Sequence, residues 1–149
     1  EWNRIYGKRG FIQYQVVFPG EDVKGLKVLL EQLVSSQRVS FLTVLKWFGP
    51  GNEGLLSFPM EGYTLALDIP NHAGLANFVE DLNFITMRYG GRLYLAKDQL
   101  MTDKMFKETY PHWTKFQEIK MKTDPDIHFS STMARRIGLV PERRRAPIC

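Results

Sequence analysis

Three segments of the chain place amide, hydroxyl and ammonium groups at the two-residue spacing of a β-strand. Gln13 and Gln15 alternate with apolar residues in one segment, Lys46 does so in a second, and Thr64 precedes the small Ala66 in a third. Neutral amides beside a cation suit a half-buried surface that hydrogen-bonds a polar ligand or a cofactor. The same residue types also occur on a sheet face that is open to water, so both interpretations remain open.

Lys97, followed directly by Asp98, is a second candidate for chemistry. The pair comes just after a short predicted strand. One interpretation is a buried or catalytic lysine, because desolvation tunes an ammonium group for such roles. The other is a charge at the end of the strand, with Asp98 as a helix cap. The residues alone do not choose between these two.

Several common catalytic and metal-binding motifs are absent. The sequence has no Gly-x-Gly-x-x-Gly, no Walker loop, no Gly-x-Ser-x-Gly and no His-Glu-x-x-His. His72, His112 and His128 lie at no metal-ligand spacing from one another, so we expect surface or capping roles for them. The single cysteine, Cys149, excludes a disulfide scaffold and a cysteine-ligated zinc site.

The elements that position these residues can be predicted from hydrophobic periodicity. Strands are predicted over residues 11–18, 40–48, 62–69 and 92–96. Apolar residues recur at helical spacing over 23–34, behind the acidic Glu21 and Asp22, and over 75–86. The order β-α-β-β-α-β predicts an α+β fold, a ferredoxin-like antiparallel sheet with its helices on one face.

Alternation along each strand separates the two faces of this sheet. We expect the apolar sets, which include Ile12, Tyr14, Leu65 and the Leu45 and Trp47 pair, to pack under the two helices. The residues left for the opposite, ligand-facing side are Gln13, Gln15, Lys46, Thr64 and Ala66.

The remaining third of the chain predicts a helical extension and a basic tail. Helical stretches are expected at about 102–109, 111–122 and 130–137, with Asp124-Pro125 between the last two. The net charge of +4 comes entirely from residues 134–149, because the preceding part sums to zero. We therefore assign residues 1–139 to one domain and 140–149 to a basic tail that we expect to be disordered, and nucleic acid is not an expected partner.

No apolar run approaches the ~20 residues that a transmembrane helix needs. We therefore expect a cytoplasmic protein, or one that associates with a membrane from its cytoplasmic or periplasmic side. The sequence starts at Glu1 and not at Met, and we expect it to be a piece of a longer protein or a processed product.

Several segments, in order along the chain, together carry a resemblance to one family. They are residues 12–17, 41–46 with 48–50, 56–59 with Gly62, 90–94 with 96–98, Tyr110-Pro111, Asp124-Pro125, Phe129 and 133–136. They resemble the C-terminal part of the decaprenylphosphoryl-β-D-ribose 2-oxidases, flavoenzymes of the vanillyl-alcohol oxidase type. That type also includes aldonolactone and alditol oxidases. The resemblance covers roughly residues 10–139.

The resemblance implies a substrate-binding domain, with FAD bound mainly by an N-terminal domain that this chain lacks. It implies oxidation of the 2-hydroxyl of a polyprenyl-phosphoryl ribose by hydride transfer to flavin N5, a step toward cell-wall arabinan. A partner NADH-dependent reductase would complete the epimerisation. The alternatives are an aldonolactone or alditol oxidase, or a ferredoxin-like ligand-binding module without a redox role. The isolated chain is expected to be inactive.

The resemblance also implies roles for residues on the ligand-facing side. Gln15 matches a glutamine beside the flavin and the substrate, and Gln13 is its neighbour. Lys46 matches a lysine that lines the substrate pocket, and Phe48 lies two residues further along the same face.

Near the end of the sheet, Lys97 matches a lysine at the N1/O2 edge of the flavin, which makes it the expected catalytic residue. Tyr94 lies near it by the same match. Two positions depart from the family: Thr64 stands where relatives carry Asn, and Ala66 where they carry the Cys that nitroaromatic inhibitors attack. We therefore expect resistance to covalent capture and an altered pocket shape.

Overall fold

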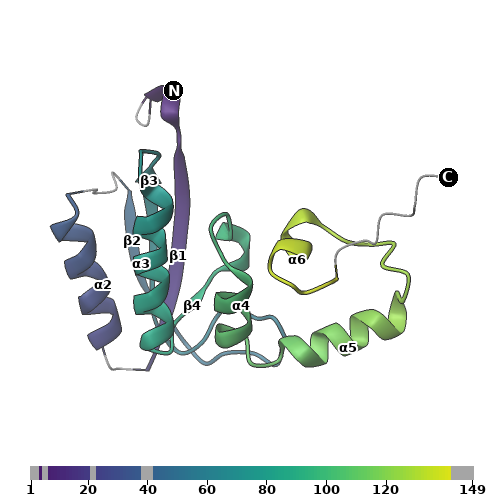
Figure 1. Ribbon diagram of the computed structural model, residues 1–149. Coiled ribbons are helices and arrows are strands. Elements are labelled where there is room, and N and C mark those ends of the chain that lie inside the picture. Colours follow the sequence, from purple (N-terminus) through teal and green to yellow (C-terminus); the bar gives the residue numbers. More distant parts are fainter. Residues whose placement is uncertain (1–3, 5–6, 21–22, 38–41, 142–149) are drawn as a thin grey trace.

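The computed structural model describes residues 4, 7–20, 23–37 and 42–141 (Figure 1). The elements follow in the order η1 (Gly7–Arg9), β1 (Phe11–Pro19), α2 (Lys24–Ser35), β2 (Thr43–Phe48), β3 (Gly62–Pro70), α3 (Leu75–Arg88), β4 (Arg92–Leu93), η2 (Leu95–Lys97), α4 (Asp103–Thr109), α5 (Trp113–Thr123) and α6 (Thr132–Arg136). Within this order, β1 to β4 form the predicted β-α-β-β-α-β unit, which confirms the fold class.

The four strands form one antiparallel sheet in the order β2-β3-β1-β4. In its register Gln13 lies opposite Asp68, and Gln15 lies opposite Ala66. Helices α2 and α3 lie side by side over one face of the sheet, and α4 to α6 extend to the right of it in Figure 1. The other face therefore has neither α2 nor α3 over it.

The core lies between the sheet and these two helices, because the apolar residues of each strand and helix face the same layer. Burying each such side chain stabilises the fold by roughly 1.5–3 kcal/mol. The buried side chains of this layer are Ile12, Tyr14, Val16, Phe18, Leu65, Leu67 and Ile69 from the sheet, and Leu26, Leu29, Leu33, Leu75, Phe78, Val79 and Leu82 from the helices.

Tyr14 connects the middle of β1 to α3 through its buried hydroxyl group. This hydroxyl donates to Asn83 Oδ1 at 3.1 Å and lies 3.2 Å from Thr86 Oγ1. Thr86 in turn donates to the backbone oxygen of Leu82 at 2.8 Å. Burial raises the pKa of Tyr14 far above its ordinary value, so the phenol stays protonated and donates.

Strand β2 is more exposed than the sequence predicted. Leu45 and Trp47 lie opposite Leu65 and Tyr63, on the side that the helices cover, as expected. However, β2 is the edge of the sheet and contributes no residue to the buried core among the described residues, so both side chains are about half exposed. Residues 38–41, where this strand was predicted to begin, lie outside the described residues.

The fourth strand is shorter than predicted, because the chain turns away from β1 after two residues. The N–H of Tyr94 still donates to Gln15 O at 2.8 Å, but the N–H of Lys97 turns back to Tyr94 O at 2.9 Å. Residues 95–97 therefore form the 3₁₀ turn η2 in place of a strand.

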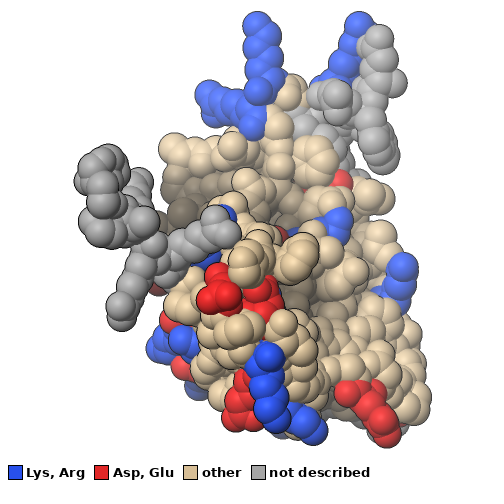
Figure 2. All heavy atoms as spheres, turned by 90° about the vertical axis from the view of Figure 1, so that its right-hand side faces the viewer, with Lys and Arg blue, Asp and Glu red and all other residues tan. Residues whose placement is uncertain are grey.

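The three predicted C-terminal helices are present as α4, α5 and α6, with slightly different bounds. On the face that carries this extension, Lys and Arg side chains are dispersed among acidic ones (Figure 2). The tail residues 142–149, with Arg143 to Arg145, lie outside the described residues. None of the helices in the described ranges has the length and the apolar character to cross a membrane.

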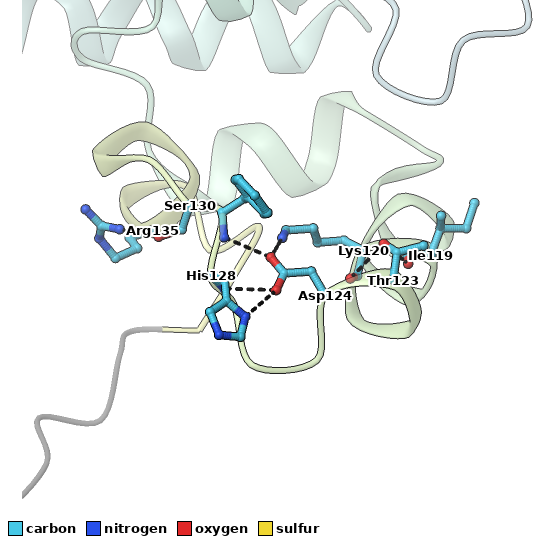
Figure 3. A network of polar contacts seen from close by, with 8 residues as sticks. Ile119, Lys120, Thr123, Asp124, His128, Ser130 and Arg135 are labelled. Carbon is cyan, nitrogen blue, oxygen red and sulfur yellow. Dashed lines mark hydrogen bonds and ion pairs between the residues drawn. The ribbon is translucent and has the colours of Figure 1, made fainter.

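A polar clamp around Asp124 closes the loop between α5 and α6 (Figure 3). The Asp124 carboxylate accepts from the Lys120 ammonium group and from the backbone N–H groups of His128 and Phe129, both at 2.9 Å. His128 Nδ1 lies 3.3 Å from the same carboxylate. The Lys120 contact, followed by the Phe129 N–H, holds the pKa of Asp124 well below its ordinary value. His128 therefore has the surface, capping-type role predicted for it.

Gly25→Ala should destabilise the chain, although Gly to Ala in an exposed helix stabilises by about 1 kcal/mol. A Cβ on Gly25 would lie 2.6 Å from Tyr89 Cβ and 2.7 Å from the ring of Phe18. Overpacking of this kind costs roughly 1–3 kcal/mol, which urea unfolding would measure. Gly49→Ala, which meets nothing within 4 Å, is the control and should be nearly neutral. An unchanged or higher stability of Gly25→Ala would contradict this packing.

Asp124→Asn should weaken the dependence of stability on acid pH. Because folding lowers the pKa of Asp124, its charged form stabilises the fold above the ordinary carboxyl value of about 3.9. This stabilisation is lost as the pH falls from that value toward the lower pKa of the folded state. The free energy of unfolding, measured from pH 6 down to pH 2, should therefore fall less steeply in Asp124→Asn than in the wild type. Asp126→Asn, two residues along, is the control, and equal slopes for Asp124→Asn and the wild type would contradict the clamp.

Candidate functional site

Three polar side chains form a hydrogen-bonded row across the face of the sheet opposite α2 and α3. The Lys97 ammonium group, at the end of η2, donates to Gln13 Oε1 on β1. Gln13 Nε2 then donates to Asp68 Oδ1 on β3 at 3.1 Å. The sheet register places Gln13 directly opposite Asp68, so this contact follows from strand pairing. Lys97 and Gln13 line an open hollow of about 460 Å³ together with Phe11, Ala96, Asp98 and Gln99.

A second polar pair lies one step further along the same strands. Gln15 Nε2 donates to Thr64 Oγ1 at 3.2 Å, and Thr64 is only 1% exposed. Ala66 lies opposite Gln15, so its small side chain shares this face. The structure thus brings together Gln13, Gln15, Thr64 and Ala66, which were expected to share this face.

Lys46 and Phe48 extend this face onto the edge strand. Lys46 lies opposite Thr64 in the β2–β3 register, and it is exposed. The ring of Phe48 meets the ring of Phe58 edge-on at 5.9 Å, and Phe58 packs on Tyr94 at 4.6 Å. Tyr94 therefore connects to the rest of the site through Phe58, a buried residue of the loop between β2 and β3.

Comparisons with known proteins place the chain in a family. The model of the family described as D-arabinono-1,4-lactone oxidase matches residues 63–137, about half of the chain. This chain belongs to the D-arabinono-1,4-lactone oxidase family. It is also 45% identical over 140 residues to the decaprenylphosphoryl-beta-D-ribose oxidase of Mycolicibacterium smegmatis, a match that covers 94% of this chain and 30% of that protein. An uncharacterized protein in the mprA 5′ region of Streptomyces coelicolor is 38% identical over 120 residues, covering 80% of this chain and 32% of that protein.

Oxidases of this family are in general flavin-dependent, so we compare the side chains of the site with what a flavin ring requires. The reduced flavin ring carries negative charge at its pyrimidine edge, and such a ring needs hydrogen-bond donors and a cation there. On the face opposite α2 and α3, the Lys97 ammonium group and the Gln13 and Gln15 amide groups each donate one hydrogen bond to a neighbouring side chain. Two N–H bonds of the ammonium group and one of each amide are left for a ligand. This donor set fits a flavin. Groups of three or more metal-ligating side chains do not occur among the residues that the structure describes.

Arg92 holds the β2–β3 loop of this family member against the sheet. Its Nη1 donates to Ser57 O at 2.6 Å, and its Nε donates to Thr109 O at 2.8 Å. Its guanidinium carbon lies 4.9 Å from the centre of the Tyr110 ring. Burial lowers the pKa of Arg92 and raises that of Tyr110. By fixing Ser57, Arg92 also fixes its neighbour Phe58 beside Phe48 and Tyr94.

Arg136 anchors the turn that carries Lys97. From α6, its Nη2 pairs with the Asp98 carboxylate and its Nη1 donates to Met101 O at 2.6 Å. Asp98 occupies the C-cap position of η2, and the N-cap of α4 is Thr102, whose side chain accepts from Met105 N at 3.1 Å.

Sequence reasoning missed three residues of this site. Alternation puts Asp68 on the same face as Thr64 and Ala66, but only the register shows that it is the partner of Gln13. Phe58 and Arg92 lay within the segments that carried the resemblance, but neither was assigned a role. Phe58 could have been singled out as a lone aromatic residue in a loop rich in turn-forming residues. Arg92 could have been singled out as a charged residue at the start of a short strand.

Arg136→Gln should loosen the turn that carries Lys97 without unfolding α6. Losing a charge-assisted hydrogen bond costs roughly 1.5–3 kcal/mol, so the amides of Lys97 and Met101 should exchange hydrogen about tenfold faster or more. Arg135→Gln is the matched control, because the Arg135 side chain donates to the exposed Ser130 hydroxyl at 2.6 Å and to no other of the described residues. Equal exchange rates in the two variants would show that Arg136 does not position Lys97.

Proposed function

We propose that this chain is the substrate-binding part of an FAD-dependent oxidase that oxidises a sugar hydroxyl to a carbonyl. Membership of the family and the 45% identity to the Mycolicibacterium oxidase support the reaction class. The chain spans about 30% of that relative, so the remaining protein would supply most of the FAD-binding surface. The observation that carries the proposal is the Lys97–Gln13 contact on a sheet face that α2 and α3 leave open.

In this reaction the carbon that bears the hydroxyl loses a hydride and the oxygen loses a proton, which leaves a ketone. When bound, FAD supplies the hydride acceptor, at N5. Lys97 would hold its positive charge at the pyrimidine edge of the ring, where negative charge develops as the hydride leaves the sugar. Gln13 orients the Lys97 ammonium group through its side-chain oxygen, and Asp68 orients the Gln13 amide.

The sugar itself would lie over Gln15 and Ala66, in the middle of the face, whereas Thr64 is buried beneath them and would act only by holding the Gln15 amide. The Gln15 amide is held by Thr64, so its oxygen remains available to a sugar hydroxyl. Lys46, exposed on the edge strand, offers a cation to a phosphoryl group. We therefore propose the 2-hydroxyl of a polyprenyl-phosphoryl ribose as the group oxidised, with an NADH-dependent reductase of the resulting ketone as the partner.

A free aldonolactone or alditol is the second candidate substrate, and the family description favours it. The hollow beside the β2–β3 loop gives no support to the lipid-linked sugar. It measures about 240 Å³ and mixes apolar residues such as Leu55 and Met60 with polar ones such as Asn52 and His112. An apolar channel for a lipid would have no such polar lining.

Anaerobic reduction of the flavin in the full-length enzyme separates these substrates. A prenyl-phosphoryl ribose and a panel of free aldonolactones and alditols are offered in parallel, and loss of the oxidised flavin absorbance is followed. Reduction by the lipid-linked sugar alone is the expected result. Reduction by the free sugars alone would move the enzyme to the lactone or alditol oxidases, and no reduction by either class would overturn the proposed reaction.

Lys97→Met in the full-length enzyme should slow flavin reduction by about 10²-fold or more, the effect of losing one preorganised charge at the reacting group. Stopped-flow absorbance with the substrate identified above gives this rate. Lys104→Met is the matched control, because Lys104 is an exposed lysine of α4 that pairs only loosely with Glu108, at 3.9 Å. If the flavin of Lys97→Met is reduced as fast as that of Lys104→Met, Lys97 has no part in the reaction.

A further inference from the structure

A buried amide group on α3 contacts two segments that each carry a residue of the candidate site. The Asn83 side chain that bears it belongs to a residue that is only 5% exposed. Its Oδ1 accepts from the Tyr14 hydroxyl group at 3.1 Å, and its Nδ2 donates to Leu100 O at 3.3 Å. Tyr14 directly follows Gln13 on β1, and Leu100 lies in the turn that follows Lys97. One side chain therefore connects the strand of Gln13 to the turn of Lys97.

The turn between η2 and α4 is held from two sides. The N–H of Met101 donates to Asp98 O at 2.8 Å, which closes this turn. Arg136 of α6 contacts both ends, at the Asp98 carboxylate and at Met101 O. The Asn83 amide contacts Leu100 O between these ends, from α3, which packs beside α4 (Figure 1). The two side chains contact different groups of the turn, so neither replaces the other.

The direction of each hydrogen bond at Asn83 is fixed by its partners. A backbone carbonyl group only accepts hydrogen bonds, so Leu100 O has to face the N–H end of the Asn83 amide. The carbonyl end of the amide is then left for the Tyr14 hydroxyl group, which has to donate. Burial raises the pKa of Tyr14, so its phenol stays protonated and can do so. An amide fits this position because it carries a donor and an acceptor on one short, planar group.

The Lys97–Gln13 contact depends on where the turn holds the backbone of Lys97. Lys97 reaches the Gln13 side chain with an ammonium group on a flexible four-carbon stem, so the stem alone does not fix the contact. β1 is fixed by its pairing with β3. The chain leaves the sheet after Tyr94, whose N–H still donates to Gln15 O at 2.8 Å. Beyond that point, side-chain contacts have to hold the turn in place.

We propose that Asn83 is a positioning residue for Lys97. By bridging Tyr14 and Leu100, it holds the turn at the distance from β1 at which the Lys97 ammonium group contacts Gln13. Asn83 is buried in the core on the helix-covered side of the sheet, so it acts on the site only through the turn.

Residue-resolved hydrogen exchange in the full-length protein tests this role. Asn83→Leu keeps the size of the side chain and removes both polar contacts, so the amides of Lys97 and Met101 should exchange at least about fivefold faster than in the wild type. Thr86→Val is the matched control. Thr86 is also buried on α3 and lies 3.2 Å from the Tyr14 hydroxyl group, but its own hydroxyl group donates within α3 and not to the turn. In Thr86→Val the two amides should exchange at the wild-type rate.

The midpoint potential of FAD in the full-length enzyme is a readout that a merely structural role would not move. This part of the inference rests on the proposed function, whereas the hydrogen exchange does not. A displaced ammonium group stabilises the reduced flavin less, so Asn83→Leu should lower the potential in the same direction as Lys97→Met. Adding Asn83→Leu to Lys97→Met should lower it no further, because Asn83 acts through Lys97. Thr86→Val should keep the wild-type potential.

Three results would overturn the proposal. Exchange of the Lys97 and Met101 amides at the wild-type rate would show that Asn83 does not hold the turn. Equally fast exchange in Thr86→Val would show a loss of stability and not of position. An unchanged potential in Asn83→Leu, where Lys97→Met lowers it, would show that the charge of Lys97 does not depend on Asn83.

Two further cases are covered by the same measurements. If Asn83→Leu does not fold, Asn83→Ala, which adds no bulk, takes its place in both experiments. If Lys97→Met itself leaves the potential unchanged, the proposed role of Lys97 at the flavin fails, and the exchange rates alone decide whether Asn83 positions Lys97.

Discussion

The pairing register of β1 with β3 is the constraint on which the rest of the structure depends. Because side chains alternate on a strand, a slip of one residue would turn Gln13 and Gln15 into the core and Tyr14 out of it. The buried Tyr14 hydroxyl opposes such a slip, since only this register lets it reach Asn83 and Thr86 on α3. An unpaired buried hydroxyl would cost roughly 1–3 kcal/mol. The same register therefore fixes the core on one face and the polar site on the other.

The site is positioned by contacts between segments that lie far apart in the sequence. The C-terminal extension contributes Arg136, whose contacts with Asp98 and Met101 hold the turn that presents Lys97. Arg92 holds the β2–β3 loop, and with it Phe58, next to the sheet. Both arginines use backbone carbonyl groups as acceptors, so each fixes the course of the chain as well as a side chain. The C-terminal extension therefore helps to position the residues of the candidate site.

Hydrophobic alternation was sufficient to predict the fold and the residues that share the sheet face opposite α2 and α3. It worked because β1 and β3 are central strands with one buried face each. It failed at β2, where Leu45 and Trp47 are half exposed, because a sequence pattern does not reveal which strand lies at the edge. It also failed after Leu93, where the Tyr94 and Lys97 backbone bonds end the strand. The Arg136–Asp98 contact joins residues 38 positions apart, and no local pattern encodes such a pair.

In the proposed enzyme, Lys97, held by Gln13, places its charge at the edge of a bound flavin. The midpoint potential of FAD in the full-length protein tests it most directly, because it reports charge near the ring without depending on the substrate. An ammonium group stabilises the reduced anionic flavin, so Lys97→Met should lower the potential by about 30 mV or more, equivalent to 1.4 kcal/mol for two electrons. Lys104→Met should leave it unchanged. Equal potentials in the wild type and Lys97→Met would show that the Lys97 charge does not lie at the flavin.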